Sequence, residues 1–339
     1  MNTMCVMDIG GTTFRCGLYQ DQAITHIEKI PTPNFYRYST APEIQRELIR
    51  AIIKAFLDKR AVHANITRLG IAFAGPMNNN GEVIASSVIF GQALTQPFPL
   101  KQMLEHELKQ LGISLETIIT TNDITASAWR YCDRGYDPFC LITVSSGIGN
   151  KIFAGGQVWI DERGTAGELG HFGIDLPNMT IPCSCGWGVN HIGMIASGRG
   201  IENMAKSTGS ENGDFRALFL SSALAADPRV NKNHELIKSE WIAEYADRLD
   251  LFPQRVIDLC TPALGNAICL LSLAMCLKKF IIIGGFALNC DYYLHSLKRS
   301  VMAKGIYNFS AHEIEEMLVL GEKDDDHALL GLGKMLEKN

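Results

Sequence analysis

The hydrophobic pattern predicts a chain in which strands and helices alternate. The opening segment, "MCVMDIGGTTFRCGLYQDQAITHIEKIPT", alternates apolar and polar positions without a helical period, which predicts three strands with a glycine-rich turn after the first. The next segment, "APEIQRELIRAIIKAFLDK", has helical spacing, a cap near Thr40 and Pro42 in its first turn. A predicted buried strand, "RLGIAFAGPM", and an amphipathic helix, "LKQMLEHELKQLG", follow it.

The second half of the chain repeats this arrangement. The segment "TIITTNDITASAWRYC" predicts a strand, a polar turn and a helix, and open α/β sheets bind ligands at such carboxyl ends of strands. The segment "FCLITVSSGIGNKIFAGGQVWI" has the same strand, turn, strand order as the N-terminus. A mainly helical stretch from about 192 to 278 precedes another strand, "FIIIGGFALN". The last helix, "HALLGLGKMLEKN", is expected to pack on the first lobe.

The composition is typical of a folded soluble protein. The 339 residues are 47% hydrophobic, enough for a large core and a two-domain chain. A formal net charge of -5 with scattered basic residues argues against nucleic acid as a ligand. Most of the ten cysteines lie in apolar segments, as reduced buried thiols do, and no secretory signal precedes the first strand. The apolar run 263–277 is too short to span a bilayer, so we expect a cytoplasmic protein without a membrane partner.

The first glycine-rich turn is a candidate phosphate-binding turn. The carboxylate of Asp8 precedes Gly10, Gly11, Thr12 and Thr13 in the predicted hairpin. Adjacent glycines let backbone N–H groups approach an anion, the threonines add donors, and the carboxylate can hold a metal-bound water. Taken alone, the segment is explained equally well as a tight hairpin.

Two further turns of the same kind favour the phosphate-binding interpretation. The second spans 145–149 and includes Ser146 and Gly147, and the third contains the pair Gly284 and Gly285. Neither a P-loop nor a dinucleotide-binding fingerprint is present to explain them. Three such turns at the ends of strands predict a nucleotide held between two lobes.

Seven segments in the same order resemble the superfamily of sugar kinases, hexokinases, actin and heat-shock ATPases, and within it the ROK family (repressors, open reading frames and kinases). They are "DIGGTTFRCGLY", "GIAFAGPM", "TNDITASAWRY", "SSGIGNKIFAGG", "GTAGELGHFGID", "CSCGWGVNHIGMIASG" and "IIIGGFALN". The resemblance covers nearly the whole chain. It implies a two-lobed, actin-like ATPase fold of the ribonuclease H-like type, in which each lobe is a mixed β-sheet flanked by helices and a cleft lies between the lobes. The N-terminal lobe is expected at 1–119, joined by the C-terminal helix 327–339. The C-terminal lobe, with a zinc loop and an adenosine-binding segment, is expected at 120–326.

The resemblance also implies roles for single residues. Asp123, beside Asn122, corresponds to the base that takes the proton from the attacking sugar hydroxyl. This role suits phosphoryl transfer, which needs positioning, charge neutralisation by magnesium and a carboxylate near the nucleophile. Asp123 is also a plausible N-cap of the following helix, and both interpretations stay open. Gly75, Glu168 and His171 are the other implied sugar contacts.

The segment "CSCGWGVNHIGMIASG" departs from the family's zinc loop, Cys-x-Cys-Gly-x-x-Gly-Cys. Aligned from its left end, the loop places the third cysteine at Asn190; aligned from its right end, it places that cysteine at His191. Imidazole is a good zinc ligand and an amide is a poor one. We therefore predict a zinc site of His171, Cys183, Cys185 and His191. A metal-free loop and a disulfide between Cys183 and Cys185 are the alternatives.

The same right-hand alignment places Gly193 where the family has a glutamate that binds the anomeric side of the sugar. Loss of a buried hydrogen-bonding carboxylate removes selection for a free hydroxyl and leaves space. We therefore expect an acceptor other than plain glucose, such as a glycoside, a disaccharide or a cyclitol.

The function predicted from the sequence is an ATP-dependent kinase that phosphorylates a hydroxyl, preferably the primary one, of a hexose-like acceptor. Magnesium is implied at Asp8 through a water, and a zinc ion is implied as a structural element. The implied ATP contacts are Gly10, Gly11, Thr12, Thr13, Ser146, Gly147, Gly284 and Gly285. The alternative is a non-catalytic ROK-type sugar sensor or pseudokinase; the few residues before "VMDIGG" leave no room for the DNA-binding domain that ROK regulators carry. Many relatives form dimers, and a homodimer is compatible with the chain.

Overall fold

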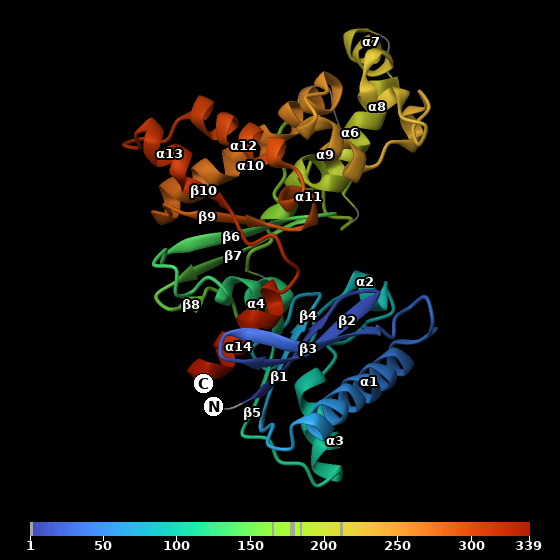
Figure 1. Cartoon of the computed structure of the whole chain (residues 1–339), viewed down its shortest axis with the longest axis vertical. Helices are drawn as coiled ribbons and strands as arrows, with labels where there is room; N and C mark the ends of the chain where they lie inside the picture. The colour runs from blue at the N-terminus through green and yellow to red at the C-terminus, as the bar shows by residue number, and fades with distance from the viewer. Residues whose placement is uncertain (1–2, 165, 177–179, 184, 211–212) are drawn as a thin grey trace. The chain divides into compact units, whose positions relative to one another are not determined.

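The computed structural model describes residues 3–164, 166–176, 180–183, 185–210 and 213–339 (Figure 1). These residues form two compact units. Unit 1 comprises Met1–Asp137, Phe153–Ala166 and Asp324–Asn339, and unit 2 comprises Pro138–Ile152 and Gly167–Lys323. The described residues contain two five-stranded sheets with helices packed on them, which confirms the predicted fold class.

The sheet of unit 1 has the strand order β3-β2-β1-β4-β5. Its strands are β1 (Met4–Ile9), β2 (Thr13–Gln20), β3 (Ala23–Pro31), β4 (Arg68–Phe73) and β5 (Thr117–Asn122). The first three strands pair antiparallel, whereas β4 is parallel to both β1 and β5. The three N-terminal strands, the turn after β1 and the buried strand β4 lie where the hydrophobic pattern predicted them.

Side chains of β1 alternate between two cores, as the strand period requires. Cys5, Met7 and Ile9 lie in a core with α1 (Ala41–Val62), α3 (Leu100–Gln110) and α2 (Ser87–Phe90). Met4 and Val6 lie in a second core with α4 (Asp123–Trp129) and α14 (His327–Lys338). A capping box at Thr40 begins α1, and its Pro42 lies in the first turn, which confirms the predicted helix start.

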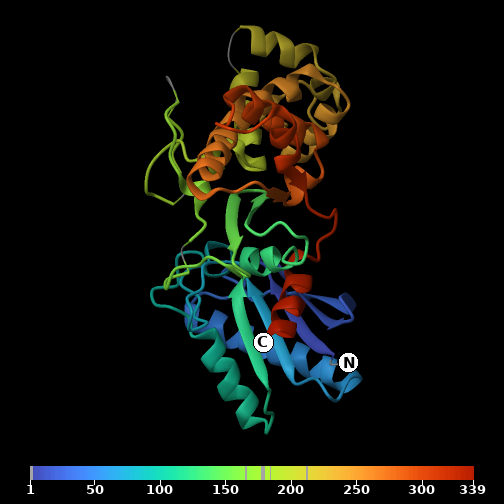
Figure 2. The same cartoon turned by 90° about the vertical axis from the view of Figure 1, so that its left-hand side faces the viewer.

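The last helix, α14, packs on α4 and on the strands of unit 1, as expected from the sequence (Figure 2). Gly331 of α14 lies so close to α4 that a Cβ there would overlap the carbonyl oxygen of Ala126, and a Cβ at Gly333 would overlap the ring of Tyr19. Glycine at these positions therefore lets α14 approach α4 and β2 closely. Because α4 packs on α14, the boundary expected between 119 and 120 lies inside unit 1, which continues to Asp137.

The second sheet has the strand order β10-β9-β6-β7-β8. Its strands are β6 (Phe139–Val144), β7 (Ile148–Ala154), β8 (Gln157–Val158), β9 (Phe280–Ile283) and β10 (Leu318–Leu320). The strands β6, β9 and β10 pair in parallel. The other α-helices are α5 (Ile192–Ala196), α6 (Gly198–Ser210), α7 (Asp214–Ser221), α8 (Ala223–Ala226), α9 (Ser239–Asp247), α10 (Leu251–Met275), α11 (Gly285–Leu288), α12 (Asp291–Lys304) and α13 (Ala311–Met317). The 3₁₀ turns are η1 (Leu169–His171) and η2 (His234–Leu236).

The long helix α10 corrects the sequence argument against a membrane span. It has 25 residues, more than the apolar run 263–277, and within the described residues it is the one helix whose length and composition would allow it to cross a bilayer. However, 61% of its most apolar window is buried inside the protein. Phe252, Ile257, Leu264 and Ile268 lie in the core of unit 2, so the packing is that of a core helix.

Candidate functional site

Asn122, at the end of β5, organises the residues around the predicted base. Its side-chain oxygen accepts hydrogen bonds from the backbone N–H groups of Ile124 and Thr125, at 3.0 and 3.1 Å, so Asn122 is the N-cap of α4. The hypothesis that Asp123 is the cap is therefore wrong: Asp123 is the first residue of the helix. The two caps were indistinguishable in the sequence because Asn and Asp are equally favoured at this position.

The side-chain amide of Asn122 also links Gly75 and Asp123, so that all three of these predicted acceptor-binding residues are connected. It donates to the carbonyl oxygen of Gly75 at 3.0 Å and to Oδ1 of Asp123 at 2.7 Å. Gly75 follows β4 and has a φ of 151°, a conformation that favours glycine. Asn122 thus holds the loop after β4 against the start of α4, at the carboxyl end of the sheet. Asp123 is the first residue of that helix.

The environment of Asp123 raises its pKa toward neutrality. Burial and the nearby negative charge of Asp8 raise the pKa of Asp123 to about 7, although hydrogen bonds from Ile124 and Asn122 oppose the shift. Burial also raises the pKa of Asp8, and Arg15 partly offsets this. A carboxylate with a pKa near neutrality exchanges protons readily at physiological pH.

The first glycine-rich turn is fixed by two polar side chains that follow β3. The hydroxyl of Thr32 donates to the carbonyl oxygen of Gly10 at 2.8 Å, and the amide of Asn34 donates to the carbonyl oxygen of Gly11 at 2.8 Å. The side chains of Thr12 and Thr13, in contrast, are exposed. The turn therefore has its carbonyl groups held by the protein and its hydroxyl groups on the surface, as a phosphate-binding turn requires.

The second turn, between β6 and β7, is fixed by the segment that links α5 to α6. The hydroxyl of Ser197 lies 3.1 Å from the carbonyl oxygen of Ser146, and the N–H of Gly198 donates to the carbonyl oxygen of Ser145 at 2.8 Å. Ser197 is completely buried, whereas Ser146 and Gly147 are exposed. As in the first turn, the carbonyl groups accept hydrogen bonds from the protein, and the side chain of Ser146 stays exposed.

A cavity of about 440 Å³ opens beside this second turn in unit 2. The residues that line it include Ser145, Ser146, Arg199, Gly285, Phe286 and Asn289. The predicted contact Gly285 thus lies at the same cavity as Ser146. Its size is within the range of small-molecule sites.

The segment with Glu168 and His171 lies against β7. Asn150 of β7 accepts a hydrogen bond from the N–H of Leu169 at 3.1 Å, and its own N–H donates to the carbonyl oxygen of Gly167 at 3.1 Å. The N–H of His171 donates to the carbonyl oxygen of Glu168 at 2.9 Å, which closes the turn η1. Glu168 and His171 are both exposed.

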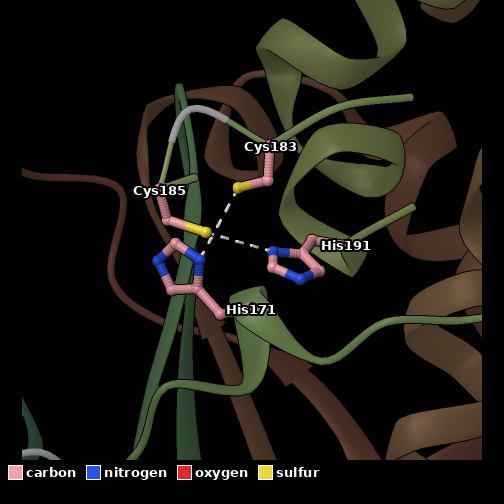
Figure 3. Close-up of side chains that lie close together, drawn as sticks. All are labelled: His171, Cys183, Cys185 and His191. Carbon is pink, nitrogen blue, oxygen red and sulfur yellow. Dashed lines mark hydrogen bonds between the residues drawn. The ribbon is translucent and has the colours of Figure 1, made fainter. Parts of the chain in front are cut away.

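Four potential metal ligands converge beside this turn, as Figure 3 shows. One ligand atom from each of His171, Cys183, Cys185 and His191 lies within 4.8 Å of every other. Nδ1 of His171 is 3.7 Å from Sγ of Cys183, and Nδ1 of His191 is 3.6 Å from Sγ of Cys185. Both cysteines are free thiols. Two imidazoles and two thiols in this arrangement match the donor set of tetrahedral zinc.

Asn190 has a different task from its neighbour His191. Its side-chain oxygen accepts from the N–H of Ile181 at 2.8 Å, its N–H donates to the carbonyl oxygen of Ile181 at 2.8 Å, and its carbonyl oxygen accepts from the N–H of Ile174 at 3.0 Å. The residue has a φ of 53° and is 6% exposed. Asn190 therefore ties the two sides of the loop together, while His191 projects toward the cysteines.

Gly193 brings α5 against the turn η1. A Cβ at this position would lie 3.0 Å from the carbonyl oxygen of Gly170, which is tighter than ordinary packing. The absence of a side chain at Gly193 thus does not leave an open space beside its Cα, contrary to the expectation from the sequence. Glycine at position 193 instead permits close contact between α5 and Gly170.

Several residues that shape these sites had no signal in the sequence. Thr32, Asn34, Asn150 and Ser197 are single polar residues in unremarkable segments, and each contacts a turn that is distant in the chain or in another element. Their burial is the feature that distinguishes them. Only the three-dimensional packing reveals which turn each one faces.

Comparison with known proteins gives a consistent family assignment. The model of the ROK family matches residues 4–338. A C(7)-cyclitol 7-kinase from Streptomyces hygroscopicus subsp. limoneus is 34% identical over 342 residues, which cover 98% of this chain and 93% of that protein. A glucokinase from Halalkalibacterium halodurans is 28% identical over 302 residues, which cover 86% and 83% of the two chains.

A solved structure has the same fold. The ROK family glucokinase from Streptomyces griseus, crystallised with glucose and AMPPNP, matches with a TM-score of 0.74. The match covers 100% of both chains at 21% sequence identity. At this identity the similarity is evidence for the fold, and the roles of single residues need their own support.

Proposed function

The chain belongs to the ROK family, and on this premise we propose that it is an ATP-dependent kinase that phosphorylates the primary hydroxyl of a cyclitol. The observation that carries the proposal is the similarity to a C(7)-cyclitol 7-kinase, at 34% identity over 98% of this chain. The match to a glucokinase is weaker in identity and in coverage. A sugar-like acceptor other than plain glucose also agrees with the glycine at 193.

In this proposal Asp123 is the general base. The acceptor hydroxyl attacks the γ-phosphorus of ATP, its proton passes to the Asp123 carboxylate, and the bond from the γ-phosphorus to the bridging oxygen breaks to release ADP. The hydrogen bond from Asn122 orients the carboxylate. Its pKa of about 7 leaves much of it ionised and still basic at neutral pH.

The glycine-rich turns bind the ATP phosphates through backbone N–H groups and hydroxyls. Thr12, Thr13 and Ser146 supply the hydroxyls, and Gly284 and Gly285 border the adenosine end. Magnesium bound to the nucleotide would neutralise charge on the phosphates. Asp8 fits that ion, because carboxylate oxygens are the ligands that magnesium prefers, and it would hold one of the waters of the ion.

Zinc fits the cluster of His171, Cys183, Cys185 and His191, since two nitrogen and two sulfur donors make a closed structural site. Four protein ligands leave no open position, so the ion would have no direct part in the chemistry. It would fix His171 and the turn that carries Glu168, the two proposed contacts to acceptor hydroxyls. The reduced thiols that such a site needs agree with a location in the cytoplasm.

The acceptor preference follows from the contact between Gly193 and Gly170. A carboxylate is absent where the family binds the anomeric side of a sugar, and α5 instead places the backbone of Gly193 against the carbonyl oxygen of Gly170. A cyclitol has a carbon in place of the ring oxygen and so has no anomeric centre. The site would therefore lose no hydrogen bond when a cyclitol replaces a sugar.

The test is a coupled ATP-consumption screen over glucose, N-acetylmannosamine, fructose, allose, β-glucosides and C7 cyclitols. We expect a kcat/KM for a cyclitol at least about tenfold above that for glucose, which corresponds to about 1.4 kcal/mol of discrimination. Glucose turned over as efficiently as every glycoside and cyclitol would contradict the acceptor assignment. Binding of these compounds without any ATP consumption would favour the alternative, a non-catalytic sensor.

A further inference from the structure

Arg15 lies between Asp8 and the segment that begins α14. Asp8 and Arg15 are directly opposite residues of the antiparallel pair β1 and β2, so their side chains share one face of the sheet. Nη2 of Arg15 is 3.0 Å from Oδ2 of Asp8, and Nη1 is 3.0 Å from Oδ1 of Asp326. The guanidinium also donates to the carbonyl oxygen of Asp325. The side chain of Arg15 is 14% exposed.

This arrangement fixes the Asp8 carboxylate on one side only. Among the described residues, Arg15 is the one side chain that forms an ion pair with Asp8, and it uses Oδ2. The bond joins two strands on either side of the first glycine-rich turn, so rotation of the carboxylate is restricted relative to that turn. The Arg15 bond reaches Oδ2, and among the described residues no other side chain donates to the Asp8 carboxylate, so Oδ1 is the oxygen that we assign to a ligand.

The segment that holds Arg15 is itself anchored within unit 1. Nη2 of Arg130, which follows α4, donates to Oδ2 of Asp324 at 2.7 Å. Arg130 and the Tyr131 hydroxyl both lie 3.1 Å from Nδ1 of the buried residue His327. These hydrogen bonds connect the start of α14 to the end of α4, the helix that begins with Asp123. Asp326, at the start of α14, in turn holds Arg15.

We propose that Arg15 is a positioning residue that aligns Asp8 for a magnesium-bound water, and that Asp326 holds Arg15 in place for this task. The C-terminal helix is then part of the nucleotide site as well as of the core. The inference rests on the proposed function, because the magnesium role of Asp8 belongs to it. A guanidinium spreads five N–H donors over a rigid planar fork and so reaches acceptors on separate segments, whereas the three donors of a lysine all lie on one nitrogen.

The test compares Arg15→Lys and Asp326→Asn with a matched control, Arg68→Ala. Arg68 anchors the opposite end of the same helix, because its Nη1 donates to the carbonyl oxygen of Leu336 at 2.6 Å. Three quantities are measured: the magnesium concentration for half-maximal rate, the affinity for ADP with and without magnesium by calorimetry, and the melting temperature of the ligand-free protein.

We expect Arg15→Lys to raise the required magnesium concentration about tenfold and to abolish most of the gain in ADP affinity that magnesium gives. Asp326→Asn, which retains Arg15, should shift both in the same direction by a smaller factor. The double variant should be no worse than Arg15→Lys alone, because both changes act through one interaction. Arg68→Ala should lower the melting temperature, and its magnesium dependence should equal that of the wild type.

An equal magnesium dependence of Arg15→Lys, Asp326→Asn and Arg68→Ala would overturn the inference. Asp8→Asn separates this result from a failure of the proposed function. If Asp8→Asn abolishes the magnesium effect while both other variants retain it, only the role of Arg15 is wrong. If Asp8→Asn also leaves the magnesium effect intact, the assignment of Asp8 itself is wrong.

Discussion

The side-chain amide nitrogen of Asn122 lies 2.7 Å from Oδ1 of Asp123, so the cap of α4 and the proposed base form one hydrogen-bonded unit. A donated hydrogen bond stabilises the ionised form of a carboxylate and therefore lowers its pKa. Asn122 thus sets both the position of Asp123 and the pH at which it can accept a proton.

Asn122→Ser should shift the pH dependence of the reaction. Serine is also a favoured N-cap, so α4 should still begin at the same residue. The base must be ionised, and activity should fall as the pH falls through the pKa of Asp123, about 7 in the free enzyme. Without the amide donor this pKa rises, so the acid limb of the profile of kcat/KM against pH should move to higher pH. An unchanged midpoint would show that Asn122 does not control the base.

Asp123→Asn should stabilise the protein at alkaline pH. The folded pKa of Asp123 is about 7, above the ordinary value of 3.8, so the carboxyl contributes stability at low pH that is lost as the pH rises from about 4 to 7. An amide has no proton to lose and escapes this loss. Urea unfolding at a series of pH values should give a difference in unfolding free energy, variant minus wild type, that grows up to about pH 7 and then levels off. A constant difference across this range would contradict the raised pKa.

One zinc ion per chain is expected in the purified protein. Cys185→Ser and His191→Ala should lose it and should melt at a lower temperature, because four ligands lie within 4.8 Å of one another. His191→Cys should retain zinc, since it restores the third cysteine of the family's loop. Cys276→Ser serves as the control, because Cys276 is an exposed thiol outside the cluster. Metal analysis that finds full zinc in His191→Ala would rule out His191 as a ligand.

Gly193→Ala should affect the acceptor and not the nucleotide. The new methyl group would lie 3.0 Å from the carbonyl oxygen of Gly170 and would press on the turn between Glu168 and His171. We expect a several-fold rise in KM for the acceptor, typical of the loss of about 1 kcal/mol from strain, at unchanged KM for ATP. Gly173→Ala, where the added atom meets only ordinary contacts of 3.4 Å and longer, is the control. Equal effects on both KM values would point to a general loss of structure instead.

The N-terminal strands and helix α1 followed from local patterns, because β1 alternates between two cores and α1 carries a capping box at Thr40. The contacts that fix the sites did not follow from such patterns. Arg15 and Asp326 are separated by 311 positions, and no periodicity relates them. Ligand chemistry alone favoured His191 over Asn190 in the sequence, and the structure adds the hydrogen bonds of Asn190 to Ile181 and Ile174, which no sequence pattern indicated.

The glycines of α14 show a second limit of sequence reasoning. Gly331 and Gly333 have low helix propensity and would be expected to weaken α14. Glycine is required there because a Cβ would overlap the backbone of α4 or the ring of Tyr19. Gly193 was expected to leave a space, but a Cβ there would lie 3.0 Å from the carbonyl oxygen of Gly170. A missing side chain indicates a cavity or a close approach, and only the neighbours decide which.

The central claim is that Asp123 is the base of a cyclitol kinase. The most direct measurement is the rate at which the wild type and Asp123→Asn form phosphorylated C7 cyclitol from ATP, with ADP affinity determined for both. We expect the wild type to form the product and Asp123→Asn to be slower by about 10²- to 10⁴-fold at equal ADP affinity. Product formation by Asp123→Asn at the wild-type rate would contradict it.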